Sequence, residues 1–180
     1  MTSFSDLVPI PPKDQMNTNL SAAREATMLK VLGKPGKLTR ECSAPTAAFR
    51  KRCLSGVDVG PFPVDGLAFA VESLKQVFDE VAAAHPQIVR EVRTEGMLCI
   101  RARRHNPSRF SNHSWGAAID LKFGPRVVDQ GIHRTQRGFL ELFPIFNKHG
   151  WYWGAEFSGD SVDSMHFELA EETILKLGNG

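Results

Sequence analysis

The stretch Ser111-Asn-His-Ser-Trp-Gly-Ala-Ala-Ile-Asp-Leu-Lys-Phe123 carries the clearest information about the fold. Polar and apolar residues alternate over residues 117–123, which predicts a strand with Asp120 on its polar face. His113 lies seven positions before Asp120, so on one continuous strand the two side chains would point to opposite faces. Gly116 lies between them, where the backbone can bend without a steric penalty from a Cβ. We therefore expect His113 on a loop and Asp120 on the strand.

A second polar stretch, Asp163-Ser-Met-His-Phe-Glu168, lies near the C-terminal end of the sequence. Residues 166–169 predict the last strand, and Asp163 is expected in the turn that leads into it. Glu168 follows His166 by two positions, so both side chains should share one face of the strand. From there, Glu168 could orient the His166 ring through a hydrogen bond.

Helices are predicted at 21–32, 65–85, 134–149 and 171–177 from apolar spacing and from the residues that begin and end each segment. Asp65 is the expected N-cap of the second helix, and Pro144 should kink the third. Residues 88–92 and 97–101 predict two strands of a hairpin. Helices mixed with antiparallel strands indicate an α+β fold, a small antiparallel sheet with flanking helices.

The prolines and glycine near residue 64 suggest a division of the chain. Residues 1–64 are expected to be an N-terminal extension, partly helical and otherwise irregular. Residues 65–180 would form the main domain, and they contain both polar stretches. The chain shows no internal repeat.

Composition excludes several classes of protein. The chain has 180 residues, 42% of them hydrophobic and 23% charged, which is typical of a globular domain. Lys+Arg minus Asp+Glu is 22 − 20 = +2, too small a bias to indicate a nucleic acid or membrane partner. The longest apolar run, residues 67–71, is far shorter than the roughly 20 residues that span a bilayer.

Cysteine usage and the first residues bear on the compartment. Cys42, Cys53 and Cys99 are odd in number and show no C-x-x-C spacing, so we expect reduced thiols rather than a disulfide framework. Asp6 and several prolines interrupt the first apolar residues, which leaves no recognisable secretory signal. We expect the protein to be cytoplasmic as synthesised.

His113, Asp120 and His166 form a three-residue set that suits Zn²⁺ at the face of the sheet. Catalytic zinc sites use three protein ligands and keep the fourth position open, whereas structural sites are closed. Such a site lowers the pKa of a bound water and polarises a carbonyl, as an amide hydrolase requires. The other histidines, at 85, 105, 133 and 149, are expected to be packed or surface residues.

With both motifs in place, the chain resembles the zinc peptidases of the D-alanyl-D-alanine carboxypeptidase group, which includes phage L-alanyl-D-glutamate endopeptidases. The resemblance runs over about residues 66–172 and rests on residues 111–121, 150–154 and 163–168. It implies that His113, Asp120 and His166 bind zinc and that residues 65–180 are the catalytic domain. It further implies that Asp163 is the general base and that an upstream arginine, for which we favour Arg101, holds the substrate and its oxyanion.

The same resemblance implies peptides of bacterial peptidoglycan as substrates. We lean toward an L-Ala-D-Glu endopeptidase, acting as a monomer, over a D-Ala-D-Ala carboxypeptidase. A phage lysin, released to the cell wall on lysis, would reconcile such a substrate with synthesis in the cytoplasm.

Several alternatives stay open at this stage. Arg103 and Arg104 compete with Arg101 for the substrate role, and the Trp151 and Trp153 side chains could line a cleft or fill the core. The chain could be a zinc-containing binding module without activity, as the similar site of hedgehog signalling domains shows is feasible. Four arginines between residues 101 and 109 would suit nucleic acid, but only one aromatic lies close by for base stacking.

Overall fold

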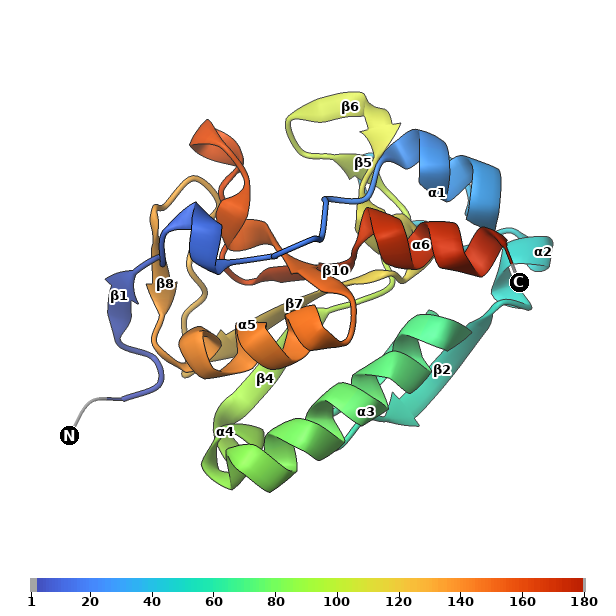
Figure 1. Cartoon of the computed structure of the whole chain (residues 1–180). Coiled ribbons are helices and arrows are strands. Elements are labelled where there is room, and N and C mark those ends of the chain that lie inside the picture. Colours follow the sequence, from blue (N-terminus) through green and yellow to red (C-terminus); the bar gives the residue numbers. More distant parts are fainter. Residues whose placement is uncertain (1–2, 180) are drawn as a thin grey trace.

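A computed structural model describes residues 3–179 (Figure 1). Its centre is an antiparallel sheet. In spatial order the strands are β4 (Val92–Gly96), β7 (Ala118–Phe123), β10 (His166–Leu169) and β9 (Trp151–Trp153). In this sheet β7 pairs with two strands that are distant in sequence, one on each side. The strands predicted at 117–123 and 166–169 are confirmed, and so is the α+β class.

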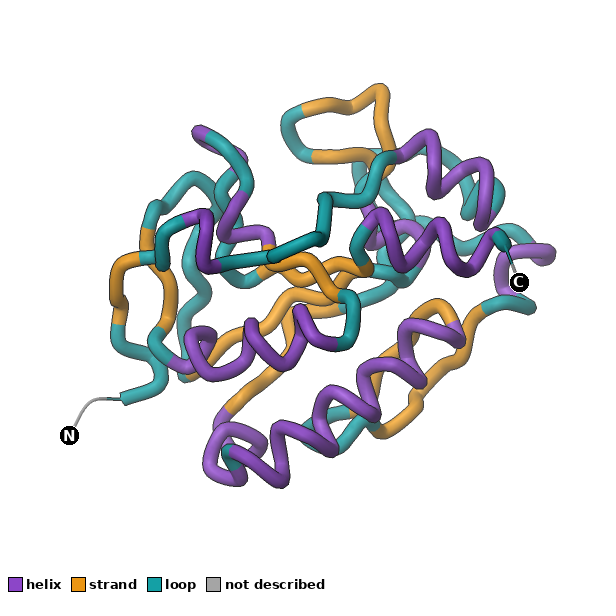
Figure 2. The backbone as a smooth tube through the Cα atoms, viewed as in Figure 1, coloured by secondary structure: helices purple, strands orange, loops and turns teal. Residues whose placement is uncertain are grey.

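Two helices, α3 (Ala68–Ala84) and α5 (Gly138–Lys148), pack side by side along the lower part of the view in Figures 1 and 2. Phe146 of α5 contacts Phe78 of α3, with ring centroids 5.9 Å apart, and Phe167 of β10 at 4.3 Å. The apolar residues of β7 belong to the same buried cluster. This packing leaves Asp120 and its same-face neighbours on the other side of the strand.

Smaller elements surround this core. Three further strand pairs are β1 (Leu7–Pro9) with β8 (Arg134–Gln136), β2 (Cys53–Asp58) with β3 (Pro63–Leu67), and β5 (Ala102–Arg103) with β6 (Asn106–Phe110). The remaining α-helices are α1 (Glu25–Leu32), α2 (Ala47–Arg50), α4 (Pro86–Glu91) and α6 (Glu171–Gly178). The 3₁₀ helices are η1 (Lys13–Gln15), η2 (Asn112–Trp115), η3 (Gly154–Glu156) and η4 (Gly159–Ser161).

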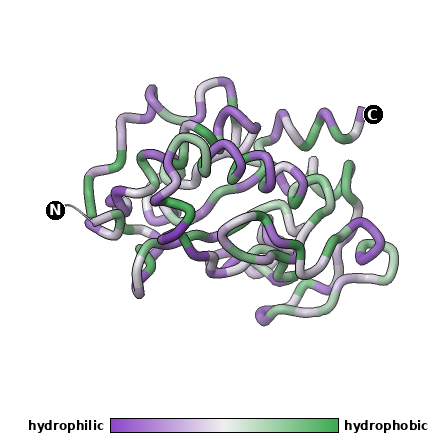
Figure 3. Tube along the Cα trace, turned by 90° about the horizontal axis from the view of Figure 1, so that it is seen from below, coloured by the Kyte–Doolittle hydropathy of each residue, from purple (hydrophilic) through white to green (hydrophobic). Residues whose placement is uncertain are grey.

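The N-terminal residues run along the domain from β1, beside β8, to α1, beside α6 (Figure 1). Phe4, Met16 and Met28 are buried in the same apolar cluster as α3 and α5. Figure 3 shows hydrophobic and hydrophilic residues mixed along α6, the helix that ends at the C-terminus, as expected for a helix with one face against the protein. The division near residue 64 stays a prediction.

The predicted hairpin over residues 88–101 is wrong. Residues 86–91 are helical because Pro86 occupies the first turn, where its fixed φ and missing N–H suit a helix start. The strand that follows, β4, pairs with β7 rather than with its neighbour in sequence. Residues 97–101 form only an isolated bridge between Ile100 and Ser43.

Three other boundaries differ from the predictions. The helix predicted from residue 134 starts at Gly138, because residues 134–136 pair with β1 as a strand. Asp65 is not an N-cap: it lies in β3, and its carboxylate accepts hydrogen bonds from the Ser55 hydroxyl and the Gly56 amide. Residues 53–67, expected to be irregular up to residue 64, form the β2–β3 hairpin.

The expectation of three reduced cysteines is also wrong. Cys42 and Cys99 form a disulfide with their Cα atoms 5.0 Å apart, and Cys53 is free. Residues 39–43 lie against residues 100–102 through backbone hydrogen bonds, which bring the two thiols together. Over residues 3–179, every helix is too short or too polar to cross a lipid bilayer.

Candidate metal centre

The register of the central sheet places two of the predicted ligands next to each other. His166 of β10 is paired with Asp120 of β7, and directly opposed residues on antiparallel strands share one face of the sheet. Glu168, two positions further, pairs with Ala118 and lies on the same face. The shared face expected for His166 and Glu168 is therefore confirmed.

The third predicted ligand, His113, comes from η2, directly before β7. Gly116 ends η2 with φ +58°, a left-handed conformation that favours glycine. A Cβ at Gly116 would lie 2.6 Å from Gly66 Cα, so the close approach of β3 also requires glycine here. The bend at Gly116 turns His113 toward Asp120, as the sequence predicted.

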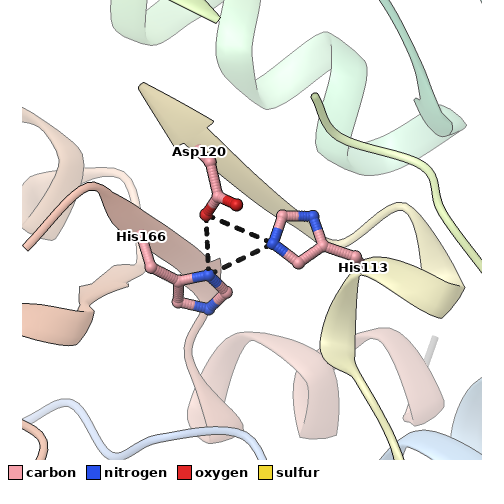
Figure 4. A group of neighbouring side chains, drawn as sticks. All are labelled: His113, Asp120 and His166. Carbon is pink, nitrogen blue, oxygen red and sulfur yellow. Dashed lines mark hydrogen bonds and ion pairs between the residues drawn. The ribbon is translucent and has the colours of Figure 1, made fainter. Parts of the chain in front are cut away.

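The three side chains converge on one point (Figure 4). His113 Nε2 is 3.2 Å from His166 Nδ1 and 3.2 Å from Asp120 Oδ1, and His166 Nδ1 is 3.1 Å from Asp120 Oδ1. Ligand atoms held at about 2.0–2.1 Å around a tetrahedral Zn²⁺ are roughly 3.3 Å apart. The spacing of these three atoms therefore fits a zinc ion.

Hydrogen bonds on the far side of each ring support this interpretation. His113 Nδ1 lies 2.8 Å from the Met97 carbonyl, and His166 Nε2 lies 2.8 Å from Glu168 Oε2. Both partners only accept hydrogen bonds, so each of these ring nitrogens must carry a proton. When both rings are neutral, as metal binding requires, their other nitrogens direct lone pairs, with one of Asp120 Oδ1, at the same point, where a cation would balance them.

The electrostatics of the centre also favour positive charge. Burial alone would raise the pKa of Asp120, but the facing His113 and His166 rings outweigh it and hold this pKa far below its usual range. Burial disfavours the charged form of His166, yet hydrogen bonds to Asp120 and Glu168 raise its pKa well above the ordinary value. A proton and a metal ion therefore compete for the same centre.

Asp163 lies before the turn that leads into β10, as predicted, at the edge of the cleft. Its Oδ1 is buried and has no hydrogen-bond partner within residues 3–179. Burial raises the pKa of Asp163 to about 6, and the charge of Asp120 acts in the same direction. Asp163 therefore has a carboxylate oxygen available for a proton or for a substrate group.

The metal centre opens into a cleft of about 740 Å³. Arg101, Arg103 and Arg104 line one part of it, and the last two lie at the turn end of the β5–β6 hairpin. Arg103 Nε donates to the Phe110 carbonyl within that hairpin. Burial lowers the pKa of Arg101, Arg104 lowers it further, and the charge of Asp120 opposes both effects. Arg101 therefore lies close enough to Asp120 for the two charges to interact. Which of the three arginines holds the substrate stays a prediction.

The structure decides whether the Trp151 and Trp153 side chains line a cleft or fill the core. Trp115, Trp151 and Trp153 are fully buried in the core cluster, so they do not line the cleft. The Trp115 indole donates to the Gly33 carbonyl, which ties the residues after α1 to η2.

The sequence interpretation missed three groups that support the centre. The Met97 carbonyl is hydrogen-bonded to His113 Nδ1, whereas the Asn112 side chain and the Ala23 amide both donate to Glu168. Backbone groups leave no signal in a sequence. Asn112 could have been noticed as a polar neighbour of His113, but nothing in the sequence links it to Glu168.

An α+β domain with a buried His, Asp and His group at an open cleft belongs to the class of candidate metal-dependent enzymes. Within that class, residues 104–169 match the family model described as D-alanyl-D-alanine carboxypeptidase, so this segment carries a domain of that peptidase family. The segment includes all three converging residues and Asp163, whereas Arg101 lies just outside it. Neither the curated proteins nor the solved structures provide a match to the chain.

Proposed function

We propose that the protein is a zinc-dependent peptidase that hydrolyses peptide bonds in bacterial peptidoglycan, and we favour the L-Ala-D-Glu endopeptidase activity. The observation that carries the proposal is the convergence of three lone pairs at the base of a cleft, within a segment of the carboxypeptidase family. His113, Asp120 and His166 would hold the ion. When bound, Zn²⁺ lowers the pKa of a water molecule and polarises a carbonyl.

Asp163 is proposed as the general base and acid of the reaction. Its unpaired, buried Oδ1 takes the proton of the attacking water and later gives it to the leaving amine. A carboxyl group whose pKa is raised toward neutrality suits both transfers. Without this transfer the amine would leave as an unstable anion.

Arg101 is proposed to stabilise the negative charge that develops on the scissile carbonyl oxygen. It is half-buried in the cleft, where its charge is less screened than it would be in water. Arg103 and Arg104 extend the positive charge along the same wall, which suits peptides that carry free carboxylates.

The place of action is part of the same proposal. Disulfides persist in oxidising surroundings and are rare in the cytosol, so the Cys42–Cys99 bond favours action outside the cytoplasm. A lysin synthesised in the cytoplasm and released to the cell wall on lysis, where it acts as a monomer, meets this condition.

The test is to digest purified peptidoglycan with the zinc-loaded protein and to identify new amino termini by mass spectrometry. New D-Glu termini support the endopeptidase, and release of free D-Ala alone supports the carboxypeptidase. His113→Ala serves as the control that lacks one ligand. If the zinc-loaded protein yields neither product but still binds the polymer, the non-catalytic binding module replaces the peptidase.

A further inference from the structure

Glu168 is a buried carboxylate held by three hydrogen-bond donors from three parts of the chain. Only 3% of its surface is exposed. Oε2 lies 2.8 Å from His166 Nε2 and accepts a hydrogen bond from Asn112 Nδ2, also at 2.8 Å. Oε1 accepts a hydrogen bond from the Ala23 amide at 2.9 Å. Both oxygens are therefore engaged, and His166 is one of three partners.

In the described part of the chain, Glu168 has no permanently charged partner. Within residues 3–179, no lysine or arginine forms an ion pair with it. A buried carboxylate without such a partner costs several kcal/mol of desolvation, which neutral donors offset only in part. The hydrogen bond to His166 gives the carboxylate a role in the proposed metal site. Because a carboxylate can only accept a hydrogen bond, the ring must donate through Nε2.

The other two donors fix where Glu168 accepts. Asn112 directly precedes His113, and Ala23 lies just before α1, in the segment expected to be an extension. Asn112 Nδ2 also reaches the Ala23 carbonyl at 3.3 Å, so Asn112, Ala23 and Glu168 contact one another. A hydrogen-bonded chain thus runs from residue 23 through Glu168 to the nitrogen of His166 that faces away from the metal centre.

We propose that Glu168 is a positioning residue that fixes the orientation of His166 for metal binding, and that the Ala23 amide and Asn112 hold Glu168 in place. The inference rests on the metal site of the proposed function. A glutamine at this position has one oxygen where the carboxylate has two, so it cannot accept from all three donors. One of the three donors, which include the His166 ring, must then lose its partner.

The first test compares the Zn²⁺ affinity of the full-length protein with those of two variants, by competition with a chromophoric chelator. Glu168→Gln should bind Zn²⁺ about 10–100-fold more weakly, as losses of such supporting groups usually do. The matched control is Glu171→Gln. Glu171 also accepts a backbone N–H from this N-terminal segment, that of Arg24 at 2.8 Å, but it is not hydrogen-bonded to either histidine. This variant should stay within about threefold of the wild type.

The second test observes the His166 Nε2 proton directly by ¹H–¹⁵N NMR, in the metal-free and the zinc-loaded protein. An Nε2 proton that is hydrogen-bonded to a buried carboxylate should resonate far downfield and exchange slowly in both forms, and its resonance should move upfield in Glu168→Gln. This signal also decides the matter if Glu168→Gln fails to fold, since a wild-type Nε2 without a protected proton overturns the proposal.

The outcomes separate the inference from the proposed function. A wild-type protein that binds no Zn²⁺ refutes the metal site itself, whatever the NMR signal shows. If the wild type binds Zn²⁺ but Glu168→Gln binds it equally well, Glu168 does not position His166. Equal losses in Glu168→Gln and Glu171→Gln would also overturn the inference, because affinity would then follow the packing of the N-terminal segment.

Discussion

At the scale of single residues, Asp163 combines two properties that a structural role does not require. The residue is half-buried, yet its buried Oδ1 has no partner in the described part of the chain. A residue that only capped the turn before β10 would have its oxygens satisfied by nearby amides. The unsatisfied oxygen supports the proposed role of Asp163 in proton transfer, because water or substrate could become its missing partner.

Asp163→Asn should keep the fold and zinc binding but lose roughly 10²–10⁴-fold in turnover, because an amide cannot accept and return a proton. The measurements are zinc content and the rate of peptide release from peptidoglycan. Asp160→Asn is the matched control, since Asp160 is an exposed acid three residues away. Equal rates in wild type and Asp163→Asn would remove Asp163 from the mechanism.

At the scale of elements, the predictability of each segment follows from how local its determinants are. The strands at 118–123 and 166–169 were predictable because alternation and the spacing of polar residues lie within each strand. The pairing of β4 was not predictable, because its partner β7 lies more than twenty residues away in the sequence and β4 forms no hairpin with the residues that follow it. The three converging side chains were predicted from the motifs, but their hydrogen-bonded supports come from distant backbone groups.

The disulfide was unpredictable for a similar reason. Cys42 and Cys99 are separated by 57 residues, and only the contact between residues 39–43 and 100–102 brings them together. Closing a loop of that length should stabilise the fold by about 4 kcal/mol in the chain-entropy model.

Reduction, or the pair Cys42→Ser and Cys99→Ser, should therefore lower the Tm markedly, as calorimetry with and without reductant would show. Cys53→Ser is the control and should leave the Tm nearly unchanged. Three thiols titratable in the native, unreduced protein would contradict the bond.

The junction of α1 and α6 predicts an acid-sensitive contribution to stability. Burial would raise the pKa of Glu171, but hydrogen bonds from the Arg24 amide, the Thr27 hydroxyl and the Arg24 side chain outweigh it and lower this pKa below 4.5. A lowered folded-state pKa means that the stabilisation is fully present above the unfolded value near 4.5 and is lost as the pH falls below it.

Glu171→Gln should thus cost about 1–3 kcal/mol at pH 7, by loss of hydrogen bonds to a charged group. As the pH falls through the lowered folded-state pKa of Glu171, the Tm of the variant should approach that of the wild type. Melting curves between pH 3 and 7 test this, and a constant difference in Tm across that range would show that ionisation of Glu171 is irrelevant.

At the scale of the whole molecule, the proposed metal centre joins three elements that are distant in sequence. Its proposed ligands come from η2, β7 and β10, and each element lies in the shared core. An ion that binds only the folded protein stabilises it by about 2.7 kcal/mol at a concentration 100 times its Kd.

Zinc at that excess should raise the Tm of the chelator-treated protein by roughly 5–10 °C, given about 2–4 °C per kcal/mol for a chain of this size. Differential scanning calorimetry gives the measurement. His113→Ala should show almost no response, and an equal rise in that variant would mean that zinc acts elsewhere.

The hydrogen bond between Ala23 and Glu168 spans 145 positions of the sequence. A ribosome makes residue 23 early and residue 168 late, so the nascent chain holds Ala23 and His113 long before it holds β10. The metal centre can form only once residues 166–168 have been translated and have paired with β7. The proposed hydrolytic activity should therefore be absent from the growing polypeptide and arise only in a late step of folding.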